Sequence, residues 1–138
     1  DSRVIIEEEI EGFEVGCAVL GNDSLILGEV DEIELTNGFL DYKEKYTLKT
    51  TTVYMPARID QDTAQRVKQT AVLIYQALHC SGLARVDLFL TPENEIVFNE
   101  VNTIPGFTSH SRYPTMLKGI GMTVPNIIDS LIKLAMNL

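Results

Sequence analysis

The sequence ARVDLFLTPENEIVFNEVN, residues 84–102, contains the pattern that decides the fold. Residues 84–90 and 95–101 are two runs rich in β-branched, aromatic and other apolar side chains, as expected of strands inside a sheet. Between them, the segment 92–94 (Pro-Glu-Asn) consists of residues that favour a turn. This stretch therefore predicts an antiparallel β-hairpin.

The two predicted strands also carry polar side chains that are unusual in a central hairpin. These are Arg85, Asp87, Glu100 and Asn102. If Thr91 pairs with Ile96 across a four-residue loop, the two acids lie opposite each other and the arginine lies opposite the asparagine. Because opposed residues point to the same face and every second residue repeats that face, all four side chains are then expected on one side of the sheet.

The two opposing carboxylates repel each other unless a cation lies between them. Oxygen ligands of this kind suit Mg²⁺, which usually binds a few carboxylates together with the phosphates of a substrate. Beside such an ion, Arg85 could bind a phosphate or an oxyanion. Two alternatives remain open. The face could be a solvated surface with an Arg–carboxylate pair, or the register could slip by one residue and separate the four side chains.

The chain before this hairpin divides into a β-rich part and a polar part. Residues 13–20 and 24–30 are β-rich runs, and the Gly-Asn-Asp segment at 21–23 between them predicts a turn, so a second hairpin is expected. The hydrophobic periodicity then stops. Residues 36–56 are expected to form a long mobile loop of the kind that often closes over a binding site.

Helical periodicity appears around and after the central hairpin. Apolar residues spaced by threes and fours, with an aspartate at the start for capping, predict a helix over 62–81 that stops before Gly82. Residues 114–118 are compatible with the start of a short helix, and 123–125 (Thr-Val-Pro) resembles the first turn of a closing helix. The expected fold class is α+β, an antiparallel sheet with flanking helices.

The composition limits the class of protein. A chain of 138 residues, 45% hydrophobic and 22% charged, is expected to form one soluble domain. Eleven Lys and Arg against twenty Asp and Glu give a net charge of -9, which argues against nucleic acid or a membrane surface as a partner. With no long apolar run and no signal-peptide pattern, a cytoplasmic location is expected. Cys17 and Cys80 are expected to be free thiols.

Three motifs together resemble a known family. They are YKEKY at 42–46, ARVDLFL at 84–90 and VFNEVNTIPGFTSHS at 97–111. In this order they are similar to the C-terminal part of a D-alanine–D-alanine ligase, an ATP-grasp enzyme. The resemblance implies that residues 1–138 are the domain that binds ATP, Mg²⁺ and the acceptor, with the mobile loop at 36–56. The N-terminal and central parts of the ligase would then be absent, in line with the missing initiator Met.

The resemblance also implies roles for the residues of the central hairpin and the motif after it. Asp87, Glu100 and Asn102 would hold two Mg²⁺ ions, for which Mn²⁺ could substitute, bridging the phosphates of ATP. Arg85 and the backbone N–H of Gly106 would form the oxyanion hole. Ser111 would bind the carboxylate of the second amino acid.

The nucleotide is expected to contact residues nearer the start of the chain. By resemblance, Glu7 would bind the adenine amino group, the backbone at Glu9 and Ile10 would contact the ring, and Glu14 would bind the ribose hydroxyls. Without the resemblance, residues 7–9 are more simply explained as a solvated acidic run.

The mobile loop supplies the remaining two candidate residues. Lys45 would reach the γ-phosphate of ATP, and Tyr46 would help the loop to close over the site and exclude water from an acyl phosphate.

The implied reaction is the ATP-dependent joining of D-alanine to a second D-amino acid through a D-alanyl phosphate, to make a peptidoglycan precursor. The pair Lys45-Tyr46 favours an amine acceptor, D-alanine or D-serine, over D-lactate. The segment 112–114 (Arg-Tyr-Pro) resembles vancomycin-resistance ligases, which favours D-serine. A homodimer is expected for the full-length enzyme. The alternatives are a non-catalytic nucleotide-binding ATP-grasp fragment and a generic α+β protein with an incidental acidic hairpin.

Overall fold

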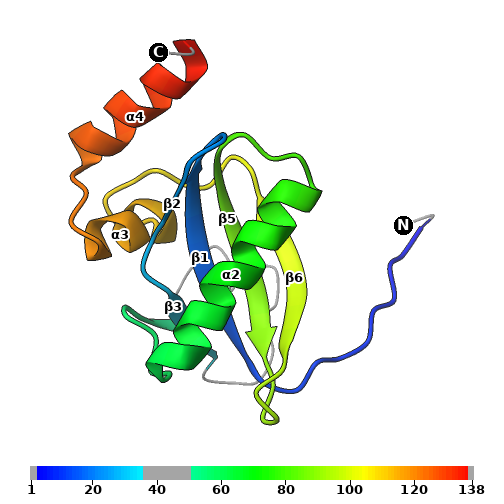
Figure 1. The fold of residues 1–138 in the computed structure, drawn as a ribbon. Helices are drawn as coiled ribbons and strands as arrows, with labels where there is room; N and C mark the ends of the chain where they lie inside the picture. Colours follow the sequence, from blue (N-terminus) through cyan, green and yellow to red (C-terminus); the bar gives the residue numbers. More distant parts are fainter. Residues whose placement is uncertain (1–2, 36–50, 137–138) are drawn as a thin grey trace.

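The structure of the chain, a computed structural model, describes residues 3–35 and 51–136 (Figure 1). The elements in order are β1 (Phe13–Gly21), β2 (Leu25–Leu27), β3 (Asp31–Leu35), β4 (Thr51–Tyr54), α2 (Gln61–Ala77), β5 (Gly82–Leu90), β6 (Ile96–Asn102), α3 (Arg112–Gly119) and α4 (Val124–Met136). The strands form one antiparallel sheet in the order β4-β3-β1-β5-β6, and β2 also pairs with β1. The expected α+β fold is confirmed.

The strand β1 is the centre of the sheet. One of its edges pairs with β5 over the whole strand, from Phe13 opposite Leu90 to Gly21 opposite Gly82. Its other edge is divided, because β3 pairs with the first half of β1 and β2 pairs with the second half. Each residue of β1 is therefore placed by neighbours on both sides, and eight of its nine residues are buried.

The hairpin predicted from 13–20 and 24–30 is confirmed only in part. The strand β2 ends earlier than predicted, because the chain turns away from β1 and Glu29 N donates to Met116 O of α3 at 2.9 Å. The strand β3 then begins, which the sequence did not predict since acids occupy three of its five positions. The predicted loop at 36–56 is wrong at 51–54, where β4 pairs with β3.

The central hairpin is confirmed, but its register arises differently from the prediction. The turn brings Leu90, and not Thr91, opposite Ile96. A regular ladder from that pair would place Asp87 opposite Asn99. A β-bulge between Asp87 and Leu88 shifts the register by one residue, so that Asp87 lies opposite Glu100 after all. The predicted cross-strand neighbours are therefore correct, although the turn pairing assumed for them is wrong.

The predicted helices are present with different limits. The helix α2 has Asp60 at its N-cap, where the carboxylate accepts from Thr63 N at 2.8 Å, but it ends at Ala77 rather than at residue 81. The backbone of His79 has a positive φ of 52°, which the helix cannot continue through. The short helix at 114–118 lies inside α3, and the closing helix α4 begins within the predicted turn.

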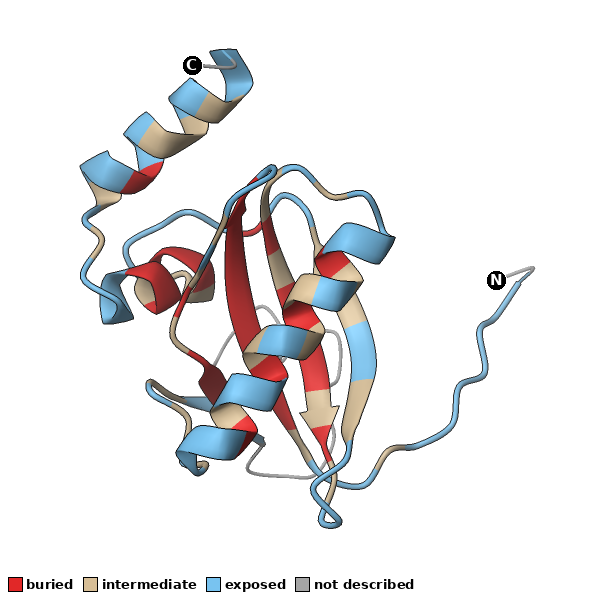
Figure 2. Cartoon of the chain, viewed as in Figure 1, coloured by how far each residue is buried: buried red, intermediate tan, exposed pale blue. Residues whose placement is uncertain are grey.

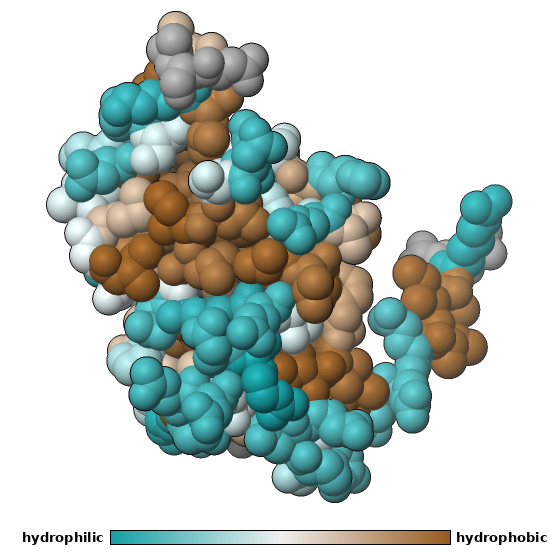
Figure 3. All heavy atoms as spheres, in the orientation of Figure 1, coloured by the Kyte–Doolittle hydropathy of each residue, from teal (hydrophilic) through white to brown (hydrophobic). Residues whose placement is uncertain are grey.

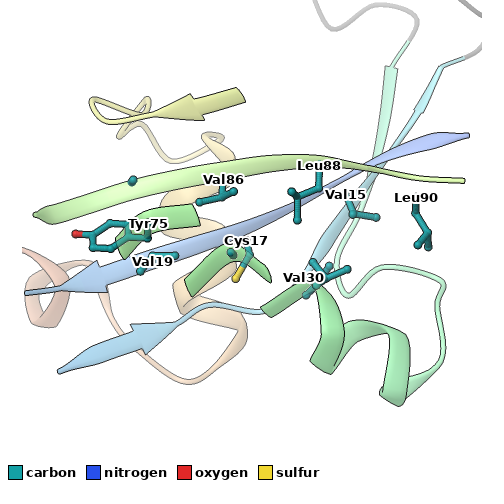
Figure 4. Packing of buried hydrophobic residues seen from close by; sticks show 11 residues of the cluster. Val15, Cys17, Val19, Val30, Tyr75, Val86, Leu88 and Leu90 are labelled. Carbon is teal, nitrogen blue, oxygen red and sulfur yellow. The ribbon is translucent and has the colours of Figure 1, made fainter. Parts of the chain in front are cut away.

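The helices cover both faces of the sheet, as Figures 1 and 2 show. The helix α2 lies over one face and buries its inner side, including Val67, Ala71 and Tyr75, against apolar residues of β1 and β5 (Figure 4). The helices α3 and α4 pack on the opposite face against Ala18 and Leu20 of β1. None of the helices in the described residues is long and apolar enough to cross a membrane.

Candidate active site

One face of the sheet carries the polar residues of the predicted site. Gly16 of β1 lies opposite Asp31 of β3 on one side and Asp87 of β5 on the other. Glu100 of β6 follows opposite Asp87. Because opposed residues point to one face and alternate residues repeat it, Glu14 belongs to this face too. The sheet therefore brings four carboxylates together around a strand position that has no side chain.

The same face is divided between an apolar end and this polar end. The apolar end is covered by α3 and α4, which bury Ala18, Leu20, Tyr113 and Met116. The polar end lies beyond the first turn of α3, from which the side chain of Arg112 reaches β3. Figure 2 shows buried residues in α3 and along β1, and these residues belong to one apolar cluster. The helix thus closes the apolar end and delivers a cation to the polar end.

Asp87 is fully buried and is bound by Arg85 of its own strand. Arg85 Nε donates to both carboxylate oxygens at 2.9 Å, and Nη2 donates to Oδ2 at 2.7 Å. An Arg–carboxylate pair is therefore present, as one of the alternatives above allows. The same alternative also assumed that the pair lies on a solvated surface. This assumption is wrong, because the side chains of Arg85 and Asp87 are only 14% and 1% exposed.

Arg112 joins carboxylates from three strands. Its Nε and Nη2 donate to the two oxygens of Asp31 at 2.7 Å each, and Nη1 donates to Glu14 Oε1 at 2.8 Å. Nη1 also lies 3.3 Å from Asp87 Oδ1. Burial disfavours the charged guanidinium, but the hydrogen bonds and charge of Asp31 outweigh it, so the pKa of Arg112 is raised.

Glu14, the predicted ribose ligand, is buried beside Arg112. Burial raises the pKa of its carboxyl group above the usual value, and the positive charge of Arg112 partly opposes that shift. Neighbouring Asp87 adds to the rise. The guanidinium is therefore the group that keeps this set of buried acids compatible with one another.

Asn102 and the loop after it lie at the end of β6 that is away from the turn between β5 and β6. Asn102 is opposite Arg85, as predicted, and its Oδ1 accepts from Ile104 N at 3.2 Å. In the loop, a Cβ on Gly106 would lie 2.9 Å from Ser111 Oγ, so the two residues are neighbours. Ser111 Oγ also accepts from Thr108 N at 2.9 Å.

The predicted adenine contacts are not brought together with this cluster. Glu7 and Glu9 are exposed in an extended segment, which Figure 1 shows leading away from the sheet, and Ile10 is half-buried near its end. Lys45 and Tyr46 lie outside the described residues. The nucleotide roles of these residues, and of Glu14, remain predictions.

The donor set of the hairpin is compatible with a hard divalent ion. Asp87 and Glu100 are cross-strand neighbours, and Asn102 lies two residues further along β6. In the described part of the chain, no three His, Cys, Asp or Glu side chains form a complete metal site. Two carboxylates and an amide suit Mg²⁺ because this ion usually takes its other ligands from water and substrate phosphates. The residues therefore fit the predicted ion, whose binding remains a prediction.

The sequence missed the part of the site that Arg112 builds. Arg112 is 81 residues from Asp31 and 98 from Glu14, and no spacing within the chain relates them. The only indication in the sequence was that two acids, Glu14 and Asp31, occur in or next to β-rich segments. The same pattern is expected of an exposed strand at the edge of a sheet. The glycine at position 16 gave no signal in an alternating strand.

Comparison with known proteins gives a consistent result. The family model described as the C-terminus of D-ala D-ala ligase matches residues 1–133. Vancomycin B-type resistance protein VanB of Enterococcus faecalis is 51% identical over 140 residues, which cover 98% of this chain and 41% of that protein. D-alanine–D-alanine ligase A of Escherichia coli is 45% identical, over 99% of this chain and 38% of that protein. The chain thus spans about two fifths of the length of these curated relatives.

Solved structures are similar over the same region. The crystal structure of the VanG D-Ala:D-Ser ligase from Enterococcus faecalis has a TM-score of 0.83 and 66% identity, and the match covers 92% of this chain and 37% of that one. The structure of the D-alanine–D-alanine ligase from Coxiella burnetii has a TM-score of 0.81 and 37% identity, over 95% of this chain and 34% of that one.

Proposed function

Because this chain belongs to the D-alanine–D-alanine ligase family, by a match over residues 1–133, we propose that it is the ATP- and acceptor-binding part of such a ligase. The enzyme joins D-alanine to a second D-amino acid through a D-alanyl phosphate, in the cytoplasm, to make a peptidoglycan precursor. One observation carries the proposal. Arg85, Asp87, Glu100 and Asn102 meet on one face, directly before the loop in which Gly106 and Ser111 are neighbours.

The hairpin provides the proposed site for phosphoryl transfer. Asp87, Glu100 and Asn102 hold Mg²⁺ in this proposal, as two ions that Mn²⁺ can replace. When bound, the metal neutralises charge on the phosphates of ATP during the transfer to the carboxylate of D-alanine. Asp87 is suited to this role because it is buried and its carboxylate is already oriented by Arg85.

Arg85 and Gly106 act on the second step, in which the amine of the acceptor attacks the acyl phosphate. A guanidinium has five N–H donors, and the pair with Asp87 uses Nε and Nη2, so the same side chain can also bind an oxyanion. Gly106 is exposed, and a residue with no side chain allows the substrate to approach the backbone closely. Ser111, beside Gly106, binds the carboxylate of the acceptor.

The remaining contacts in the proposal belong to ATP and to the loop. Glu7, the backbone at Glu9 and Ile10, and Glu14 bind the nucleoside. Lys45 contacts the γ-phosphate, and Tyr46 helps to exclude water, which would otherwise hydrolyse the acyl phosphate. The full-length enzyme is proposed to be a homodimer.

The acceptor is proposed to be D-serine, with D-alanine as the second candidate, and the enzyme is proposed to act in vancomycin resistance. Support for D-serine comes from the 66% identity to a protein named as a D-Ala:D-Ser ligase. Support for D-alanine comes from relatives named as D-alanine–D-alanine ligases.

The test is an assay of the full-length protein that contains this chain. ADP release is measured with ATP, Mg²⁺ and D-alanine alone, and again with D-serine added, and the dipeptides are identified by mass spectrometry. We expect D-alanyl-D-serine to be the main product when both amino acids are present. Formation of D-alanyl-D-alanine alone would leave the ligase function standing and overturn the acceptor. No ADP release under either condition would overturn the function.

A further inference from the structure

The guanidinium of Arg112 lies in a space that exists because residue 16 has no side chain. A Cβ at Gly16 would lie 2.4 Å from Arg112 Nη2 and 2.7 Å from Asp31 Oδ1. Both distances are too short for non-bonded atoms, so even alanine would displace the ion pair or the strand. Gly16 has an ordinary backbone conformation and is not required by a turn. A glycine at this position of β1 therefore leaves space for the Arg112 guanidinium, and we call this space the Gly16 socket.

Within the Gly16 socket, Arg112 is held firmly on one side and contacts the candidate site on the other. The two bonds to Asp31 are bidentate, at 2.7 Å each, and fix the plane of the guanidinium. The third nitrogen, Nη1, is thereby directed at Glu14 Oε1, at 2.8 Å, and at Asp87 Oδ1, at 3.3 Å. Asp31 thus sets the direction in which Arg112 meets the other two acids.

Asp87 consequently lies between two guanidinium groups. Arg85 binds it from its own strand through Nε and Nη2, and Arg112 approaches Oδ1 from α3. A buried carboxylate held from two directions has little freedom to rotate. Partners of this kind, which orient a ligand without touching the metal, typically change metal affinity by about 10- to 100-fold when they are lost.

On the premise of the ligase function above, we propose that Arg112, seated in the Gly16 socket, is a positioning residue that fixes the carboxylate of Asp87 for metal binding. The residue does so through three strands at once, since Asp31 orients it and Glu14 shares its Nη1. No contact between Arg112 and a substrate is needed for this role.

The test uses substitutions that keep every charge, because removing a cation next to a metal site would by itself strengthen metal binding. Arg112→Lys retains the positive charge, but a single ammonium cannot reproduce the bidentate and branched contacts of the guanidinium. Gly16→Ala leaves all charged residues in place and fills the socket. The two variants therefore disturb the same geometry by independent routes.

The measurement is the affinity of the full-length protein for Mn²⁺, determined from the electron paramagnetic resonance signal of the free ion in the presence of ADP. We expect both variants to bind Mn²⁺ about tenfold or more weakly than the wild type. Arg58→Lys is the matched control, since Arg58 also pairs with acids, Glu32 and Glu34, at the edge of the sheet away from Asp87. Its Mn²⁺ affinity should equal that of the wild type.

Thermal unfolding of each variant separates this role from a structural one. If Arg112→Lys and Gly16→Ala are folded and bind Mn²⁺ like the wild type, Arg112 only stabilises the fold and the proposal is wrong. If both variants fail to fold, Asp31→Glu is used instead, because its extra methylene group shifts the guanidinium without a change of charge. Weaker Mn²⁺ binding by this variant supports the proposal, and unchanged Mn²⁺ binding overturns it.

The proposed function can fail separately. If the wild-type protein releases no ADP with D-amino acids, the ligase assignment is wrong whatever the variants do. If it is active and the variants bind Mn²⁺ normally, only the role of Arg112 is wrong.

Discussion

Asp87 and Glu100 are the two carboxylates of the proposed metal site. They are the two acids that the hairpin register places side by side, and Asp87 is one of the few fully buried acids among the described residues. A buried acid is costly unless it is paired, and Arg85 and Arg112 supply that pairing here. The burial of Asp87 is therefore explained by its two guanidinium partners.

Replacement of Glu100 by glutamine tests the metal assignment directly. The amide keeps the size of the side chain and removes the negative charge, so the proposed metal site keeps only one of its two carboxylates. In the full-length protein we expect Glu100→Gln to abolish ADP release with D-alanine and D-serine. The assay is a coupled measurement of ADP.

The matched control for that variant is Glu93→Gln, in the exposed turn between β5 and β6. It makes the same chemical change on the same hairpin and should retain full turnover. Ordinary turnover by Glu100→Gln would remove Glu100 from the proposed site.

At the scale of elements, β3 and β4 are joined by a second set of charged side chains on the face away from the candidate site. Arg58, which follows β4, donates from its backbone N to Glu32 Oε2 at 2.8 Å and pairs with the same carboxylate through its guanidinium. The guanidinium also lies 3.6 Å from the centre of the Tyr54 ring. Tyr54 O–H donates to Glu34 at 2.8 Å. These contacts explain how β3, which is rich in acids, pairs stably with β4 at this edge of the sheet.

The pH dependence of stability follows from Glu32. Hydrogen bonds from Arg58 lower the pKa of its carboxyl group below the ordinary value of 4.5. A carboxyl group with a lower pKa in the folded state stabilises the fold above roughly pH 4.5, and that stabilisation is lost as the pH falls through the folded-state pKa. We expect Glu32→Gln to lower the urea midpoint at pH 7 and to have less effect at acidic pH.

The measurement is urea unfolding of the 138-residue chain and of the variant, at pH 7 and at acidic pH. Asp23→Asn, on the exposed turn between β1 and β2, is the control for the loss of one acid. An equal effect of Glu32→Gln at both pH values would contradict the assignment.

The connection between β1 and β3 is the segment that differs most from the sequence-based prediction. The strand β2 is short because α3 takes the next backbone bond, at Glu29, and a Cβ at Gly28 would lie 2.9 Å from Met116 Cβ. The end of β2 is therefore determined by α3, since Glu29 bonds to Met116, which is nearly ninety residues later in the chain. A local pattern cannot contain that information.

At the scale of the molecule, several large apolar side chains are exposed on the surface, including some of those on α4. Figure 3 shows apolar side chains gathered on the part of the surface next to α4, where Ile128 and Ile132 are 45% and 53% exposed. They lie one turn apart and so share a stripe of the helix. Of the two adjacent isoleucines of α4, Ile127 is buried in the core and Ile128 is exposed.

The size of the chain relative to its relatives leads to a prediction about the isolated piece. It spans about two fifths of their length, and the predicted adenine contacts Glu7 and Glu9 are exposed. We expect the 138-residue piece to bind ATP with Mg²⁺ much more weakly than the full-length protein, and to be inactive alone. Isothermal titration calorimetry of both forms measures the difference.

Equal affinity of the two forms would show that this piece captures the nucleotide by itself. The alternative of a non-catalytic nucleotide-binding fragment would then gain support. A titration of both forms with Mg²⁺ and no nucleotide is the control for metal binding alone.

The amino-acid sequence was enough to predict the central hairpin, the helices and the α+β class, because alternation and helical spacing are local properties of the chain. It also placed Asp87 opposite Glu100, although the register depends on a bulge that the turn residues do not predict. How the acids of three strands coexist follows from the packing of the folded chain and from no local pattern. Arg112 reaches them from α3 through the space above Gly16, and such a contact depends on how strand and helix pack, not on any spacing within the sequence.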